Sequence, residues 1–246
     1  MTDTNSCLVE KLSHYMTLDD TARRHLAALE ETEKTFSRHA EVWHLGEAVS
    51  HLFVVKRGWC YTHTDLPDAR RQIVRVLLPG DIVGFPDIAF DHATTDLRTA
   101  ETTCLCPFPK KRLDVIFEQS PKLTALLFTL ANRELACMVD TLRALGRMSA
   151  RERIAWFLLD LIARLRITNP QMSTTMRMPL NQHEIGDALG LTHTYVSKTL
   201  GRMEDGGLLR RAEGTITLEG EERLKEMVEF TNRYEALDTS WFPTAH

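Results

Sequence analysis

The stretch NQHEIGDALGLTHTYVSKTLGRM, residues 181–203, decides how the C-terminal part of this chain folds. Asn181 is a good helix N-cap, and Glu184 three residues later completes a capping-box pattern. Gly190 stands where a helix ends and the chain turns, and Thr192 can cap the helix that follows. The stretch therefore predicts two short helices joined by a tight turn, which is the layout of a helix-turn-helix.

The second of these helices has one apolar and one polar side. Val196, Leu200 and Met203 share the inward side at helical spacing. A glycine in mid-helix costs about 1 kcal/mol relative to alanine, so Gly201 indicates a close approach to another molecule. An ordinary surface hairpin of helices is the alternative. If the helix reads DNA, the candidate contacts on its polar side are Thr192, His193, Thr194, Ser197, Lys198, Gly201 and Arg202.

The flanks favour the DNA reading. Residues 208–211 and 215–218 are two expected strands around a turn at 212–214, and a charged helix follows over roughly 220–235. This order predicts a winged helix. Residues 147–211 carry 10 Lys and Arg against 6 Asp and Glu, whereas residues 212–246 carry 3 against 8. The positive charge therefore gathers where phosphates would be held.

Composition is that of an ordinary globular protein of 246 residues with a formal net charge of −4. The N-terminus is polar, and no apolar run is long enough to cross a membrane, so we expect a cytoplasmic protein. An odd number of cysteines without regular spacing predicts reduced thiols. Any of them is a possible redox switch, although buried, inert thiols are commoner. They are Cys7, Cys60, Cys104, Cys106 and Cys137.

The N-terminal half has a different pattern of apolar and turn residues. Residues 18–35 predict one short helix or a pair of helical turns, and residues 40–109 are short apolar runs broken by turn residues. The last run, residues 99–108, reads as one extended stretch. Many short strands at this spacing predict an antiparallel β-roll or jelly roll.

A long helix begins after Ser120, because Pro121 is a favoured first residue of a helix. One apolar stripe, residues 123, 127, 130 and 137, can pack on the β-roll, and a second stripe has coiled-coil spacing. We predict a dimer seam, with a single broad core face as the alternative. Residues 146–149 are the expected hinge, followed by a helix over 150–166 and a polar loop over 167–179. The seam consists of Phe128, Ala131, Leu135, Met138, Leu142 and Leu145.

The expected fold class is α+β, with a sensor β-roll and leading helices over 1–119, a dimerisation helix and hinge over 120–147, and a winged helix-turn-helix domain over 148–246. This order resembles the cyclic-AMP receptor protein / fumarate-nitrate regulator (Crp/Fnr) family of bacterial transcription factors. The resemblance is carried by LLPGDIVGF at 77–85 and by the residues from Glu184 to Met203. It implies a homodimer on a two-fold symmetric operator, with RNA polymerase as a further partner.

The resemblance places a possible effector pocket at Gly84, Phe85, Arg98 and Thr99. Family members that bind cyclic AMP use a glutamate where Phe85 stands, and Arg98-Thr99 matches only their phosphate-binding pair. A structural role for Arg98 is the better interpretation, so we do not predict control by cyclic AMP. Oxygen-sensing members carry a glutamate at the position of Thr194 and an arginine at that of Lys198, so we expect a different operator.

No cofactor is predicted. The oxygen-sensing members hold an iron-sulfur cluster on several N-terminal cysteines, but only Cys7 stands there in this chain. His44, His51 and His63 lie in the roll without the pattern of a metal-dependent jelly-roll enzyme, which leaves haem and cluster as weak options and no metal site.

The sequence therefore predicts a DNA-binding transcriptional regulator, controlled by an effector or redox signal at the roll. The alternative is a ligand-binding signalling module whose C-terminal domain docks a protein. We find no catalytic constellation and do not expect an enzyme. Effector, operator, target genes and the choice between activation and repression are not specified.

Overall fold

A computed structural model describes residues 6–68 and 70–243. The chain forms two compact units. Unit 1 contains the residues up to Thr64, Arg75–Glu134 and the segment from Ala236 onward, and unit 2 contains Asp65–Val74 and Leu135–Glu235. The boundary falls inside a helix, so the division into three functional parts stays a prediction.

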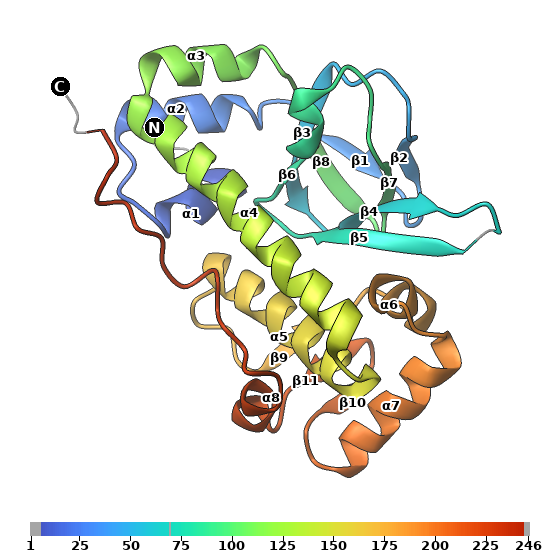
Figure 1. Cartoon of the computed structure of the whole chain (residues 1–246). Coiled ribbons are helices and arrows are strands. Elements are labelled where there is room, and N and C mark those ends of the chain that lie inside the picture. Colours follow the sequence, from blue (N-terminus) through green and yellow to red (C-terminus); the bar gives the residue numbers. More distant parts are fainter. Residues whose placement is uncertain (1–5, 69, 244–246) are drawn as a thin grey trace. The chain divides into compact units, whose positions relative to one another are not determined.

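The N-terminal half forms two four-stranded antiparallel sheets, as the sequence predicts, and their strands lie in unit 1 except for Asp65 and Arg71–Val74 (Figure 1). One sheet has the order β1-β8-β3-β6 and the other has the order β2-β7-β4-β5. Helices α1 (Cys7–Ser13), α2 (Asp20–Ala28) and α3 (Arg112–Gln119) also belong to unit 1. The strands are β1 (Lys34–Phe36), β2 (Glu41–Trp43), β3 (His51–Arg57), β4 (Cys60–Asp65), β5 (Arg71–Leu77), β6 (Ile82–Val83), β7 (Asp96–Thr99) and β8 (Thr103–Pro109), with a 3-10 turn η1 (Pro86–Ala89) after β6.

The expectation of one extended stretch over 99–108 is wrong. The chain turns between β7 and β8, which belong to different sheets. The turn is stabilised because the Ala100 amide and the Thr103 hydroxyl both donate to the carbonyl of Trp59, at 2.9 and 2.8 Å. Helices α1 and α3 were not predicted. Both contribute apolar residues to one core cluster, including Leu8 and Ile116.

Helix α4 (Pro121–Arg147) begins at the predicted proline. Leu123, Leu127 and Cys137 on its first stripe are buried. The chain leaves the helix at Met148, and Ser149 caps α5 (Ala150–Thr168) through a capping box with Glu152. A break between helices therefore stands at the predicted hinge, while hinge motion stays a prediction.

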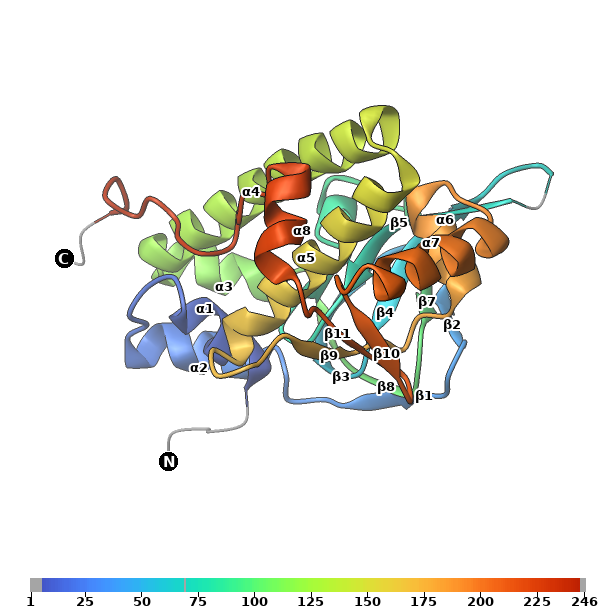
Figure 2. The ribbon, with the colours of Figure 1, turned by 90° about the horizontal axis from the view of Figure 1, so that it is seen from below.

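Unit 2 contains a helix pair and a small sheet (Figure 2). The helices are α6 (Gln182–Leu189) and α7 (His193–Asp205), and the sheet order is β10 (Arg210–Ala212), β11 (Thr215–Thr217) and β9 (Thr175–Arg177). The wing is thus confirmed, but β9 lies inside the region predicted as loop. The first wing strand starts at Arg210 because the two leucines before it, 208 and 209, are fully buried in the core.

The last helix, α8 (Glu221–Val228), is shorter than predicted. It ends because Glu229 adopts the left-handed conformation, with φ of +48°. Over the described residues, no helix combines the length and the apolar character that crossing a bilayer requires.

Candidate nucleic-acid interface

The start of α6 is fixed by the predicted capping box. The Asn181 side chain accepts hydrogen bonds from the amides of His183 and Glu184 at 2.9 and 3.0 Å. The Glu184 carboxylate accepts from the Asn181 amide at 2.8 Å. Because these bonds satisfy donors that a helix N-terminus otherwise leaves open, the sequence sets where α6 begins.

The turn between α6 and α7 depends on two glycines. Gly190 has φ of +63°, as its position predicts. Gly186 was not singled out from the sequence, yet a Cβ atom there would lie 2.4 Å from the carbonyl oxygen of Leu191. Only glycine allows this approach. Thr192 then caps α7 by accepting from the Tyr195 amide at 3.3 Å.

Helix α7 presents the two sides that its sequence predicts. Val196, Leu200 and Met203 are buried in unit 2. The predicted DNA-contacting residues lie on the remainder of the same helix and at its cap. Thr192, His193, Thr194, Lys198 and Arg202 are exposed, whereas Ser197 and Gly201 are partly exposed.

The two basic side chains of α7, Lys198 and Arg202, form no polar contacts with the described part of the chain, since neither takes part in an ion pair or a hydrogen bond there. At Gly201 a Cβ atom would meet nothing within 4 Å, so the close approach suggested for this glycine is not to the chain itself.

Two features of this surface were missed by the sequence analysis. Tyr195 is 47% exposed, although a large aromatic side chain usually packs inside. The ring of His183, from α6, stacks on His193 with 4.1 Å between ring centroids. This contact depends on the geometry of the turn, so no sequence pattern indicates it.

The local excess of arginine overstates the charge open to DNA. Arg166 forms a two-point ion pair with Glu221, at 2.7 and 2.8 Å, and Arg211 pairs with Glu204 at 2.9 Å. The hydrogen bonds from Arg166 lower the pKa of Glu221 to about 2. These arginines hold unit 2 together, which leaves Lys198 and Arg202 as the exposed cations of α7.

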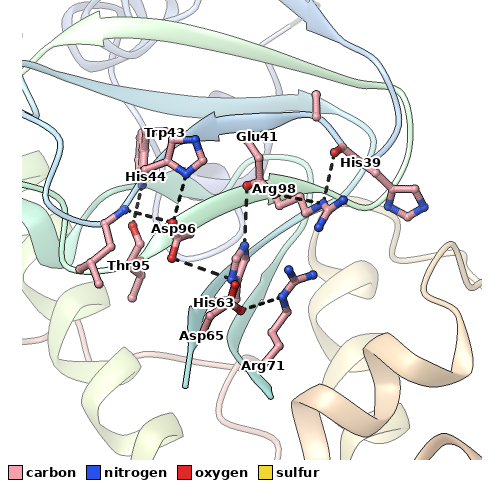
Figure 3. Close-up of polar contacts among 12 residues, drawn as sticks. His39, Glu41, Trp43, His44, His63, Asp65, Arg71, Thr95, Asp96 and Arg98 are labelled. Carbon is pink, nitrogen blue, oxygen red and sulfur yellow. Dashed lines mark hydrogen bonds and ion pairs between the residues drawn. The ribbon is translucent and has the colours of Figure 1, made fainter. Parts of the chain in front are cut away.

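In the β-roll, the side chains of Arg98 and Thr99 both have partners within the roll, and Figure 3 shows the contacts of Arg98. Arg98 Nε lies 3.3 Å from Glu41 Oε1 and donates to the carbonyl of His39 at 3.2 Å. The Thr99 hydroxyl donates to the carbonyl of Ser37 at 2.7 Å and is fully buried. An anion at Arg98 would therefore have to compete with the Glu41 carboxylate.

The other predicted effector residues follow β6, which belongs to the other sheet of the roll. Gly84 follows β6 with φ of +84°, and a Cβ atom there would lie 2.9 Å from the Leu52 side chain. Phe85 precedes η1 and packs against the core. These two positions therefore serve packing and chain direction.

A buried histidine stands beside Arg98 and had no assigned role. His63 is 2% exposed, with Nε2 3.7 Å from Glu41 Oε2 and Nδ1 4.0 Å from Asp96 Oδ2 (Figure 3). The two carboxylates face opposite edges of the ring, so the groups surround the imidazole instead of converging on one point. Among the described residues, no set of three or more His, Cys, Asp or Glu side chains is placed to hold a metal ion.

Comparison with known proteins supports both halves of this reading. A family model described as a cyclic nucleotide-binding domain matches residues 33–120, and one described as a Crp-like helix-turn-helix domain matches residues 152–227. The fumarate and nitrate reduction regulatory protein of Escherichia coli (strain K12) is 26% identical over 227 residues, which cover 92% of this chain and 90% of that protein. The chain belongs to the Crp/Fnr family.

Solved structures of Crp/Fnr regulators share this fold. FixK2 from Bradyrhizobium japonicum has a TM-score of 0.72 and 27% identity, covering 80% of this chain and 96% of its own. A mutant of CooA from Carboxydothermus hydrogenoformans has a TM-score of 0.65 and 24% identity, covering 93% and 97%, and shows the fold alone. This chain is thus a Crp/Fnr-type DNA-binding transcriptional regulator with an effector-type domain, and the protein-docking alternative finds no support among these matches.

Within this Crp/Fnr chain the cysteines are free thiols, mostly buried. Burial raises the pKa of Cys60 and raises that of Cys106 to about 12. The Cys104 thiol donates to a Glu33 carboxylate oxygen at 3.3 Å, and burial raises its pKa as well. These thiols are protonated at neutral pH and are therefore poor nucleophiles.

Proposed function

We propose that this Crp/Fnr regulator acts as a homodimer that reads a two-fold symmetric operator, with α7 of each protomer in the major groove. The observation that carries the proposal is the polar side of α7, whose Lys198 and Arg202 have no partner within the described chain. Their roles are contacts to phosphate or to guanine. His193, Thr194 and Ser197 are the candidates for base edges, since hydroxyl and imidazole groups can donate or accept.

The exposed stripe of α4 supports the dimer. Phe128, Leu135 and Leu142 are 62%, 62% and 69% exposed, and Met138 and Val139 are more than half exposed. Ala131 and Leu145 on the same stripe are partly exposed. Apolar side chains at coiled-coil spacing are stabilised by covering them with a partner helix. The stripe thus becomes the interface between two copies.

In this proposal the protein works by binding, without catalysis, in the bacterial cytoplasm where the operator lies. RNA polymerase is the partner through which occupancy of the operator changes transcription. The β-roll supplies the effector-type domain. Because Arg98 is paired with Glu41, cyclic AMP remains outside the proposal.

The test is Leu135→Glu. A charge in the seam must be desolvated in the dimer, so we expect the dimer dissociation constant to rise by about 100-fold or more, equal to about 3 kcal/mol. Sedimentation equilibrium measures dimerisation, and a gel shift measures operator binding, which should fall with it. Val115→Glu, at an exposed position of α3, is the matched control. A Leu135→Glu protein that remains as dimeric as the wild type contradicts the proposed interface.

A further inference from the structure

The chain continues beyond α8 along a defined path. Residues 229–243 contain no further helix or strand. In unit 2, Tyr234 is buried and its hydroxyl donates to Asp160 Oδ1 at 2.6 Å. A buried hydrogen bond to a carboxylate holds this part of the tail in one conformation.

The last described residues of the tail are anchored in unit 1. Phe242 is 7% exposed and belongs to the core cluster, and Leu237 packs against that cluster. Between them, the Asp238 carboxylate accepts hydrogen bonds from the Ser240 amide and hydroxyl, at 3.0 and 2.6 Å. The Phe242 amide donates to the Thr239 carbonyl at 3.1 Å. Trp241 therefore stands on a short, fixed turn.

This turn presents Trp241 outward, although tryptophan is the residue with the most apolar surface to bury. Trp241 is 53% exposed, whereas Trp43, Trp59 and Trp156 are at most 8% exposed. Its ring meets Phe128 edge to face, with centroids 6.5 Å apart and an interplanar angle of 85°. Phe128 is itself 62% exposed and is the first residue of the α4 seam.

We propose that the C-terminal tail is part of the dimer interface, where Trp241 and Phe128 of one protomer pack on a second copy of this chain. The inference rests on the proposed homodimer and adds a second element to it. We choose a second copy of this chain as the partner because Phe128 belongs both to the aromatic pair and to the α4 seam. The aromatic pair therefore extends the proposed dimer interface. In a two-fold dimer the same patch is present on both subunits, so each aromatic pair is covered once by the partner.

Fluorescence quenching tests the position of Trp241 directly. It is the one exposed tryptophan of the four, so iodide should quench its emission selectively. We expect the quenchable fraction to fall as protein concentration rises through the dimer dissociation constant, and to stay constant in Leu135→Glu. Quenching of Trp241 that is equal in monomer and dimer overturns the proposal.

Substitution tests the contribution of the side chain. We expect Trp241→Ala to raise the dimer dissociation constant about tenfold in sedimentation equilibrium, and Trp241→Phe to restore most of it. Phe117→Ala, an exposed aromatic on α3, is the matched control and should leave dimerisation unchanged. If the wild type dimerises through Leu135 but Trp241→Ala has the same dissociation constant, the tail inference fails alone. If the wild type is monomeric throughout, the homodimer and the tail inference fail together.

Discussion

The roll and helix α7 both carry cations that the sequence marks as possible anion ligands, but only the cation of the roll is paired within the protein. Arg98 of the roll already contacts the Glu41 carboxylate and the backbone carbonyl of His39. Lys198 and Arg202 of α7 have no partner within the described residues. A cation that is already paired with a carboxylate of the protein is not available to an external anion. We therefore expect Lys198 and Arg202, but not Arg98, to bind an external anion.

The same difference extends to the surroundings of these cations. The helix-turn-helix domain has a capped helix pair, a wing and an open polar surface on α7. In the β-roll, the Glu41 carboxylate pairs with Arg98, and the buried His63 ring lies between the carboxylates of Glu41 and Asp96. We therefore expect the polar surface of α7 to be unaffected by substitutions at Arg98 or Glu41 in the roll.

The largest effect should come from Gly186→Ala, which removes the reading surface itself. The added Cβ atom would lie 2.4 Å from the Leu191 carbonyl oxygen, so the turn cannot close without moving backbone. We expect unit 2 to lose about 3 kcal/mol or more of unfolding free energy, measured by urea denaturation. Gly201→Ala is the control, because its Cβ meets nothing within 4 Å. Equal stability of Gly186→Ala and wild type would show that the turn tolerates a side chain.

Next in size is Lys198→Ala, which removes one of the two open cations. We expect specific operator binding to weaken by about 1–3 kcal/mol in a gel-shift titration, with the dimer intact. Lys111→Ala removes an equal charge from an exposed site before α3 and should not affect binding. Unchanged operator affinity in Lys198→Ala would remove this residue from the interface.

A smaller effect on stability is expected from removing the charge of Glu221, which pairs with Arg166 in unit 2. Arg166 lowers the pKa of Glu221 to about 2 from an ordinary value of 4.5. A carboxyl with a lowered pKa stabilises the fold above pH 4.5, and this contribution is lost as pH falls from 4.5 towards 2. Glu221→Gln should cost about 1–2 kcal/mol near pH 7, after allowing for partial solvent exposure.

The pH dependence provides the check on that pair. Urea unfolding at a series of pH values should show the difference between Glu221→Gln and wild type shrinking steadily below pH 4.5. A difference that stays constant down to pH 3 would mean that the Arg166–Glu221 charge interaction contributes nothing.

The smallest effect should come from Arg98→Ala in the roll. The ion pair with Glu41 is partly exposed, so its loss should cost less than about 1 kcal/mol of stability. We also expect cyclic AMP to leave the melting temperature of the wild type unchanged, because Glu41 holds the arginine. A clear rise in melting temperature with cyclic AMP, abolished in Arg98→Ala, would show that the pocket opens to the nucleotide.

The sequence predicted the helix pair well because its signals are local. Asn181, Glu184, Gly190 and Thr192 each act within one turn of the residue that they cap. The apolar stripe of α4 is also visible in the sequence, because its residues recur at regular helical spacing, while its role as a dimer seam stays a prediction. The exposure of Phe128, Leu135 and Leu142 agrees with that pattern.

Long-range contacts account for what the sequence analysis missed. The break between β7 and β8 depends on Trp59, some 40 residues earlier in the chain. The pairing of Arg98 with Glu41 and the stacking of His183 on His193 likewise join residues that no local pattern connects. The tail turn at Trp241 is anchored by burial of Phe242, which composition alone does not indicate.

The most direct measurement is the salt dependence of operator affinity, taken on sequences selected from random DNA. If α7 holds phosphates and bases in each half-site, the logarithm of the association constant should fall linearly and steeply between about 50 and 200 mM salt. The slope should be shallower in Lys198→Ala, by about one for each phosphate that the variant no longer neutralises. An affinity that does not change with salt, or a Lys198→Ala protein whose affinity and salt slope both equal those of Lys111→Ala, would contradict the assignment of α7 as the DNA-reading helix.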